Sequence, residues 1–311
     1  MSGDAARGSS GDSMDVHAVP GTREPLARPA LRGGLSLRGE LRVLGGFFLR
    51  RMAEFFSNRT NTLFGFMEIT AVAILFGIMG RFINEYSSPK LLQHLQGCPD
   101  YISFLIVGHL VTLMVWSAHG NVSWLVRSRE FPNLYMAPCR LPTIVLGANM
   151  WKYCWIVIEL FLLMLISGLL FGVTFHLNAG FILVVLGGIW MMTAFDMIGA
   201  GFKIITKSDA DPINWTIGIT GVVLSGQFFP IQALPEWAQP LCKLHPQYYI
   251  NSLARRTVGE GLDLAGLWAR EDLRMQMVGF LITSVVFLVA GWWIFTLGFR
   301  RARVEGTLGH E

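Results

Sequence analysis

The sequence predicts an all-α membrane protein with six transmembrane helices. Of its 311 residues, 52% are hydrophobic and only 15% are charged, whereas soluble domains carry about 25% charged residues. Six apolar segments also approach the roughly 20 residues that a helix needs to cross a bilayer. We place these segments at residues 63–82, 102–125, 151–173, 180–204, 213–231 and 276–299.

The chain before the first apolar segment divides into two parts. Residues 1–40 are rich in Gly, Ser, Ala, Pro and Arg without an apolar run, which predicts a disordered cytosolic tail. In residues 41–62, which are too polar to span, apolar side chains recur at helical spacing: Leu41, Leu44, Phe48, Met52 and Phe55. We expect an amphipathic helix in the cytoplasmic membrane interface. The alternative is a helix packed on a soluble domain, but the rest of the chain supplies no such domain.

The basic residues predict the orientation. Arg and Lys gather before the first span, in the second and fourth loops and in the C-terminal tail, and they are scarce in the first and third loops. By the positive-inside rule, both termini are cytoplasmic. We expect a multi-pass protein of the inner (cytoplasmic) membrane, with residues 63–305 forming the membrane domain. The fifth loop is also basic, but loops of this length count less in the rule. The net charge of +4 is then topology charge, and we expect no nucleic-acid partner.

Several kinds of chemistry find no support in the sequence. There is no GxxxxGK[ST] motif for phosphate binding, no readable Ser-His-Asp or paired-carboxylate site, and no close CxxC pair among the four cysteines. We therefore expect no catalytic residues, no metal site and no cofactor in this chain.

The most informative segment follows the fifth apolar stretch. Residues 225–237 read Ser-Gly-Gln-Phe-Phe-Pro-Ile-Gln-Ala-Leu-Pro-Glu-Trp, and residues 245–249 read His-Pro-Gln-Tyr-Tyr. Proline breaks the helix at Pro230 and again at Pro246. Residues 232–256, the hairpin segment, are too short and too polar to span, so we expect two short re-entrant helices. Trp237, Leu241 and Leu244 would face lipid or neighbouring spans. We expect this hairpin to pack on the fifth and sixth spans and to help close the outer end of a path through the membrane, and the alternative is a loose external loop. The residues that would form this gate are Phe229, Pro230, Pro235, Trp237, His245, Pro246 and Tyr249.

This segment resembles the last extracytoplasmic hairpin of type-2 ABC exporter permeases, whose pattern is roughly Ser-Gly-x-x-Phe-Pro-x-x-x-Leu-Pro, then x-Pro-x-x-Tyr. The resemblance covers about residues 41–305 and includes the amphipathic helix before the first span. It implies a dimer of permeases, here a homodimer, with two cytosolic ATPase subunits. ATP and Mg²⁺ would bind to those ATPase subunits, so the chain alone would not be an enzyme.

The second cytoplasmic loop holds the position at which such permeases dock a short helix into the ATPase. The resemblance implies that the docking residues are Arg129, Glu130, Phe131, Leu134, Tyr135, Met136 and Pro138. The family's Gly-Thr-Leu-Glu is replaced here by Phe-Pro-Asn-Leu at 131–134. The alternative is an ordinary solvated loop.

Three carboxylates lie within the predicted spans: Glu68, Glu159 and Asp196. Intramembrane carboxylates usually face protein or water, so these could line a substrate path or pair between helices. Lys152 and Lys203 lie seven residues from Glu159 and Asp196, which places each pair on one helix face. His109 and His119, on or near the second span, are better explained as interior packing than as ligands.

Cys98 and Cys242 fall in predicted extracytoplasmic loops. In an oxidising compartment they could form a disulfide, and two free thiols are the alternative.

The resemblance implies that the chain is the permease subunit of an ATP-driven exporter. The absence of a distinctive sugar-binding motif favours a lipid-like or small hydrophobic substrate. Export of polysaccharide or lipid-linked oligosaccharide is the first alternative, and a passive membrane protein, such as a scramblase or an assembly subunit, is the second.

Overall fold

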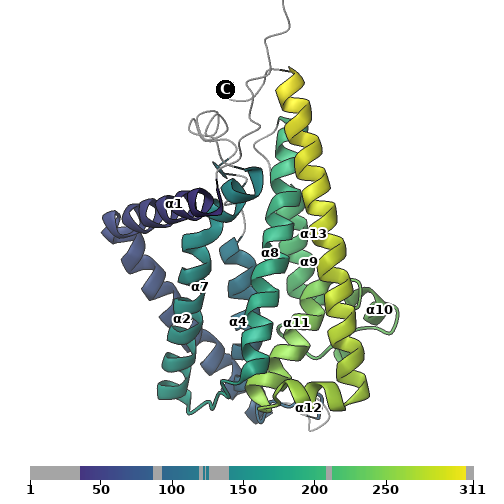
Figure 1. The fold of residues 1–311 in the computed structure, drawn as a ribbon. Helices are drawn as coiled ribbons and strands as arrows, with labels where there is room; N and C mark the ends of the chain where they lie inside the picture. Colours follow the sequence, from purple (N-terminus) through teal and green to yellow (C-terminus); the bar gives the residue numbers. More distant parts are fainter. Residues whose placement is uncertain are drawn as a thin grey trace, which may run out of the picture. The chain divides into compact units, whose positions relative to one another are not determined.

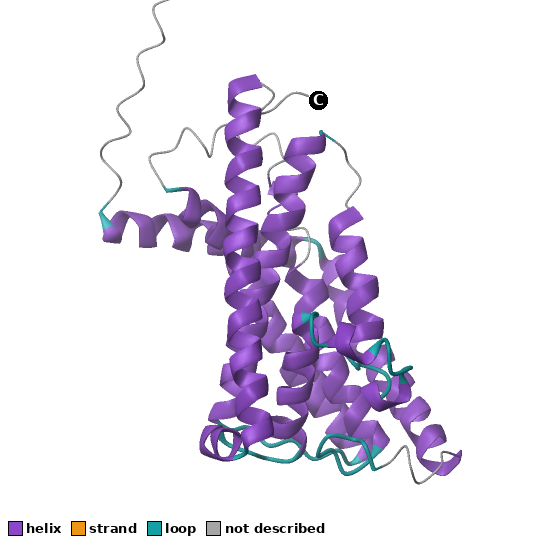
Figure 2. Cartoon of the chain, turned by 90° about the vertical axis from the view of Figure 1, so that its right-hand side faces the viewer, coloured by secondary structure: helices purple, strands orange, loops and turns teal. Residues whose placement is uncertain are grey.

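The structure, a computed structural model, describes residues 36–86, 93–118, 122, 124–125, 140–207 and 212–305. The chain divides into Met1–Gly34 and Leu35–Glu311, and all described residues lie in the second unit. The regular elements of these residues are helices (Figures 1 and 2). The predicted all-α class is therefore confirmed. Most of the predicted tail lies outside the described residues.

Two consecutive helices open the described chain, α1 (Leu37–Ser57) and α2 (Arg59–Tyr86). The Ser36 side chain caps α1 by accepting a hydrogen bond from Gly39 N (3.4 Å). Residues 37–40 are thus helical rather than part of a tail, and 41–62 is not one helix. The chain turns at Asn58, and the Thr62 hydroxyl donates to the carbonyl of Phe55 near the end of α1 (2.9 Å).

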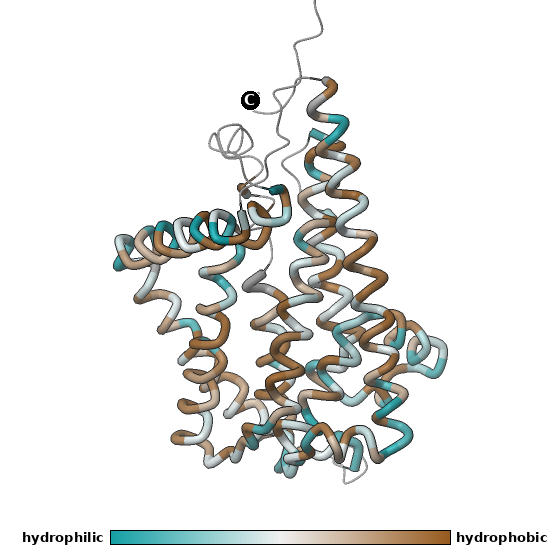
Figure 3. Tube along the Cα trace, viewed as in Figure 1, coloured by the Kyte–Doolittle hydropathy of each residue, from teal (hydrophilic) through white to brown (hydrophobic). Residues whose placement is uncertain are grey.

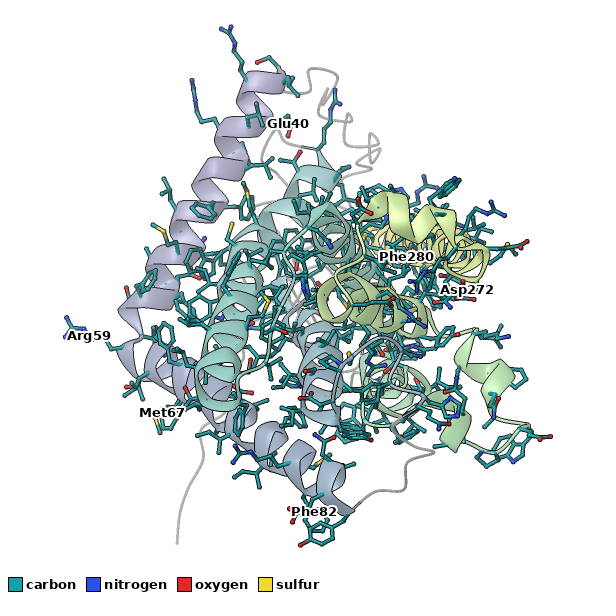
Figure 4. All side chains as sticks on the ribbon, turned by 90° about the horizontal axis from the view of Figure 1, so that it is seen from below. Glu40, Arg59, Met67, Phe82, Asp272 and Phe280 are labelled. Carbon is teal, nitrogen blue, oxygen red and sulfur yellow. The ribbon has the colours of Figure 1, made fainter. Side chains whose placement is uncertain are left out.

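Helix α1 lies across the ends of α2 and α7 (Leu141–Phe171) (Figure 1). Hydrophilic and hydrophobic residues alternate along its length (Figure 3), which fits the amphipathic pattern. Its position at a membrane interface remains a prediction. Below this crossing, α2 points Met67 and Phe82 away from the other helices (Figure 4), and both side chains are exposed.

Four described helices are long and apolar enough to cross a bilayer: α2, α7, α8 (Ala179–Thr206) and α13 (Glu271–Glu305). Two shorter apolar stretches, Tyr101–Val115 and Trp215–Leu224, belong to α4 (Tyr101–Ala118) and α9 (Pro212–Leu224). At 1.5 Å per residue, α9 covers only about 20 Å of a hydrocarbon core roughly 30 Å thick. Each predicted span thus corresponds to a helix, but the count of six crossings remains a prediction.

The predicted spans and the helices differ at several ends, and two of these differences have a clear local cause. Helix α7 begins at Leu141 rather than at 151, with Pro142 in its first turn, where proline's missing N–H costs nothing. Helix α9 ends at Leu224 rather than at 231, because Gly226 adopts a left-handed conformation (φ +71°) before Pro230 is reached.

Helix α4 is the central helix of the bundle. It contacts α2, α7, α8 and α11 (Pro246–Ala254), and residues 104–107 are at most 1% exposed. A helix that is apolar on all sides is stable only when it is surrounded. This central position brings Gly108, His109 and Thr112 into the interior.

The chain between α9 and α13 forms only short elements. They are η1 (Ile231–Ala233), α10 (Gln239–Cys242), α11, the π-helical turn η2 (Arg255–Gly259) and α12 (Leu264–Ala269). Helix α11 begins at Pro246, the second predicted break. Helix α12 lies at the end of the bundle opposite α1, α11 runs toward it, and α10 projects from the side of the bundle above it (Figure 1). We call this part of the bundle the hairpin end.

Helices α8 and α13 run side by side with closely spaced backbones (Figure 1). Glycines permit this approach, as in other membrane helix pairs. A Cβ atom at Gly298 would lie 2.7 Å from the carbonyl oxygen of Gly201, and one at Gly291 would lie 2.6 Å from that of Ala194.

We expect Gly298→Ala to lower the thermal unfolding temperature of the detergent-solubilised protein, because the new methyl group would push α13 away from α8. Overpacking of this kind costs about 1–3 kcal/mol. Gly46→Ala is the matched control: its Cβ would meet no atom within 4 Å, so it should leave stability unchanged or raise it. Equal unfolding temperatures for the two variants would contradict the close α8–α13 contact.

Candidate functional site

A partly open cavity of about 450 Å³ lies among α2, α4, α7 and the end of α9. Much of its wall is apolar, with Ile69, Val72 and Phe76 from α2 and Leu163 from α7. Polar side chains also line it: Glu68, His109, Thr112, Lys152, Glu159 and Gln227. The volume is in the range of small-molecule sites, and a mainly apolar wall with a few polar groups is typical of them.

The cavity unites two of the three predicted intramembrane carboxylates. Glu68 comes from α2 and Glu159 from α7, and Lys152 lies on the same cavity. Asp196 on α8 does not line it. That carboxylate is fully buried and accepts a hydrogen bond from Val122 N (2.8 Å). Glu68 and Glu159 are therefore placed where they could line a substrate path. Asp196 instead connects α8 with the chain at Val122.

Aromatic side chains hold Glu159 in place. Its carboxylate, on a residue only 8% exposed, accepts a hydrogen bond from the indole N–H of Trp155, one turn earlier. The Trp155 ring packs against Phe55 of α1 and Phe66 of α2, with centroids 4.3 Å and 5.6 Å apart. Helix α1 therefore contributes to the wall that orients a cavity carboxylate, although it does not line the cavity.

His109 lies on the cavity wall with neither ring nitrogen hydrogen-bonded. Its ring packs against Phe76, with centroids 4.8 Å apart. An unpaired polar group in a protein interior is costly, and both nitrogens are buried although the residue lines the cavity. The interior location of His109 agrees with the prediction from the sequence, which did not foresee that the residue lines a cavity. His119 lies outside the described residues.

The turn after α9 closes the cavity toward the hairpin end. Residues 225–228, which we call the 225–228 turn, have left the helix, and Gln227 and Phe228 line the cavity. Each carbonyl of this turn accepts a hydrogen bond from a side chain. The donors are Asn251 to Ser225, Arg255 to both Gly226 and Gln227, and Tyr101 to Phe228.

A second cavity of about 270 Å³ lies at the hairpin end, next to η1 and α10. Its lining is mainly polar and includes Gln96, Gln232, Glu236, Gln239, Lys243 and Tyr248.

The predicted gate residues do not converge on one point. Trp237 is 74% exposed and Leu244 is 70% exposed, so both side chains lie on the outside of the hairpin segment. Tyr249 meets α13, where a Cβ atom at Gly279 would lie 2.7 Å from its ring. The His245 ring faces Phe195 of α8, with centroids 6.3 Å apart. Phe229, Pro230, Pro235 and Pro246 line neither cavity. The hairpin segment is thus packed on the bundle rather than loose.

Arg255, which joins the hairpin segment to the cavity turn, was not among the predicted site residues. In the sequence it is one of several basic residues of a long loop. No local sequence pattern separates it from those residues, because its burial depends on the tertiary path of the hairpin segment.

Cys98 and Cys242 are both buried free thiols, so the disulfide is not formed in the structure. Cys98 packs against η2, where a Cβ atom at Gly259 would lie 2.9 Å from its sulfur. Cys242 donates to the carbonyl of Ala238 within its own helical turn (3.6 Å). Each thiol therefore belongs to a different packing site.

The ATPase-docking residues proposed for the second loop, 129–138, lie outside the described residues. Their role remains a prediction.

The four long apolar helices define a multi-pass helical membrane protein. Residues 44–258 match the ABC-2 type transporter family, and the chain belongs to this family. No curated protein matches it. The match confirms the resemblance to type-2 ABC permeases and covers most of α1, both cavities and the whole hairpin segment. The family implies, in general, a partner ATPase subunit.

Burial raises the pKa of Cys98 to about 12, so about one thiol in 10⁵ is ionised at pH 7. Because the thiolate is the reactive form, we expect Cys98 in the native protein to resist maleimide at pH 7 and to react after denaturation in SDS. A cysteine introduced at Gln232, which is exposed in the same region, should react in both conditions. Mass mapping distinguishes the two sites, and rapid native labelling of Cys98 would contradict its buried position.

Proposed function

We propose that this chain is the permease subunit of an ATP-driven exporter that moves a lipid-like or small hydrophobic substrate out of the cytoplasm. Family membership supports the permease role. ATP and Mg²⁺ would bind to a separate cytosolic ATPase, present in two copies beneath a homodimer of permeases. In this arrangement α1 and both termini lie on the cytoplasmic side of the inner membrane. The hairpin end faces the opposite, extracytoplasmic side.

The 450 Å³ cavity is the observation that carries the substrate class. Its apolar wall suits a hydrocarbon body, and its charged residues, Glu68, Lys152 and Glu159, suit a polar head group. An amphiphile satisfies both parts at once, because the apolar part is removed from water while the head group keeps polar partners.

Polysaccharide or lipid-linked oligosaccharide export is the second candidate, and the 270 Å³ cavity favours it. Amide and hydroxyl groups such as those of Gln232, Gln239 and Tyr248 both donate and accept hydrogen bonds, as sugar hydroxyls require. A passive scramblase or assembly subunit would need no ATPase. Copurification of an ATPase with the chain therefore separates an ATP-driven exporter from that class.

Filling the cavity tests the substrate site. We expect Val72→Trp to abolish transport of a fluorescent lipid analogue and its stimulation of ATP hydrolysis in proteoliposomes, because the indole would occupy space that the substrate needs. Val286→Trp on the exposed face of α13 is the matched control and should retain both activities. Full transport by Val72→Trp would place the substrate elsewhere. Competition by an oligosaccharide but not by the lipid analogue would favour the second candidate.

Charges in the second loop test the coupling to the ATPase. We expect Leu134→Asp combined with Tyr135→Asp to abolish substrate-stimulated ATP hydrolysis, because a carboxylate in an apolar groove loses its hydration. Membrane insertion should be unchanged, as judged by retention of the variant in the membrane fraction after an alkaline wash. Ser128→Asp, in the same loop, should have little effect. Normal stimulation in the double variant would exclude these two residues from the ATPase contact.

A further inference from the structure

Arg255 is a buried cation without an acidic partner in the described part of the chain. The residue is 1% exposed, and its guanidinium makes none of the ion pairs found there. Its carbon lies 3.5 Å from the ring centroid of Phe104 on α4. Burial lowers the pKa of Arg255 to about 10, so the side chain still carries its charge at neutral pH.

The charge is stabilised by carbonyls of the 225–228 turn. Nη2 of Arg255 donates to the carbonyls of Gly226 (2.8 Å) and Gln227 (3.0 Å). Both residues lie beyond Leu224, the last residue of α9, so these carbonyls belong to the irregular turn. A hydrogen bond to a charged group is stronger than one between neutral groups. The two turn carbonyls therefore take the place of the missing carboxylate.

Helix α4 is shaped to admit this contact. A Cβ atom at Gly108 would lie 2.7 Å from Nη2 of Arg255 and 2.7 Å from the carbonyl oxygen of Gln227. Only glycine leaves room for both groups against the helix. Three elements, α4, the 225–228 turn and η2, thus meet at one guanidinium.

The same guanidinium contacts a lining residue of each cavity. Nη2 bonds Gln227, which lines the 450 Å³ cavity. Nη1 donates to the side-chain oxygen of Gln96 (2.9 Å), which lines the 270 Å³ cavity. On the same turn, Phe228 lines the larger cavity and packs against Phe76, with ring centroids 5.8 Å apart. Arg255 therefore belongs to the wall that separates the two cavities.

We propose that Arg255 is a positioning residue for transport, which holds the 225–228 turn closed between the two cavities, and that its release from the Gly226 and Gln227 carbonyls joins them into one path. This inference rests on the proposed function, in which the larger cavity is the substrate site.

The arrangement requires the fork of an arginine. One guanidinium nitrogen bonds two successive carbonyls while the other reaches Gln96 across the turn. Lysine would keep the charge but not this planar geometry. Arg256, the next residue, is different: it pairs with Glu260 (2.7 Å), and both side chains are 25% exposed. It serves as a matched control.

The test uses a cysteine reporter in the larger cavity. Val222→Cys is placed in a background whose native cysteines are replaced by alanine, and the permease–ATPase complex is reconstituted in proteoliposomes without ATP. A membrane-impermeant maleimide is added to the hairpin side. We expect slow labelling with Arg255 present and labelling about tenfold faster or more in Arg255→Met, because hydrogen bonds to a charged group are lost.

Further variants separate the wall from general stability. Arg255→Lys and Gly108→Ala should also speed labelling, the latter because its methyl group would displace the guanidinium while the charge remains. Either variant carries the test if Arg255→Met does not fold. Arg256→Met should label as slowly as the parent protein. Equal labelling rates for the parent and for every folded variant of Arg255 and Gly108 would overturn the proposal.

A second readout distinguishes failure of this inference from failure of the proposed function. Maleimide applied from the α1 side should reach Val222→Cys, and the lipid analogue should slow that reaction in the parent protein. Absence of such protection would remove the cavity as the substrate site, whatever Arg255 does. If the lipid analogue protects Val222→Cys but the Arg255 and Gly108 variants are labelled from the hairpin side as slowly as the parent, only the role of Arg255 would be overturned.

Discussion

Backbone carbonyls that leave a helix and are buried in the protein need hydrogen-bond donors, and the hairpin end is organised around this need. A buried carbonyl without a partner is costly, so nearly all such groups are paired. The 225–228 turn receives its donors from Tyr101, Asn251 and Arg255. These residues belong to α4, α11 and η2, which are remote in sequence. The path of the hairpin segment is therefore fixed by the carbonyls that it must satisfy.

The opposite end of the larger cavity is held in a comparable way by side chains that do not line it. Phe55 of α1 packs on Trp155, whose indole N–H holds the Glu159 carboxylate. Helix α1 itself is fixed on α7 by the close approach of Phe47 to Gly147, where a Cβ atom would lie 2.6 Å from the ring. A shift of α1 would thus change the aromatic packing around a cavity carboxylate. A contact between α1 and a partner subunit would reach the cavity through these rings.

Helices α2, α4, α7, α8, α9 and α13 could be predicted from the sequence because each coincides with an apolar run, and membrane helices need little else. Their ends were less predictable. The start of α7 at Leu141 depends on a proline that serves as a helix start, and the end of α9 depends on one left-handed glycine, Gly226. The place of Glu159 within a predicted span identified it as an intramembrane carboxylate, but the sequence could not show which helices face it. Arg255 could not be separated from the other loop arginines, because its burial results from the tertiary path of the hairpin segment.

The partners of Arg255 are two carbonyls and an aromatic ring rather than a carboxylate. Such partners suit a wall between two cavities that has to open during transport. A buried ion pair leaves two uncompensated charges when it separates, and breaking one by removing a partner costs about 3–5 kcal/mol. Neutral carbonyls bind a guanidinium less strongly, and water can replace them once the adjoining cavities are hydrated. The Phe104 ring would still face the cation after the turn had moved, because it belongs to the central helix rather than to the turn. A cation bound by dipoles and an aromatic ring thus stabilises the closed turn without an ion pair that opening would have to break.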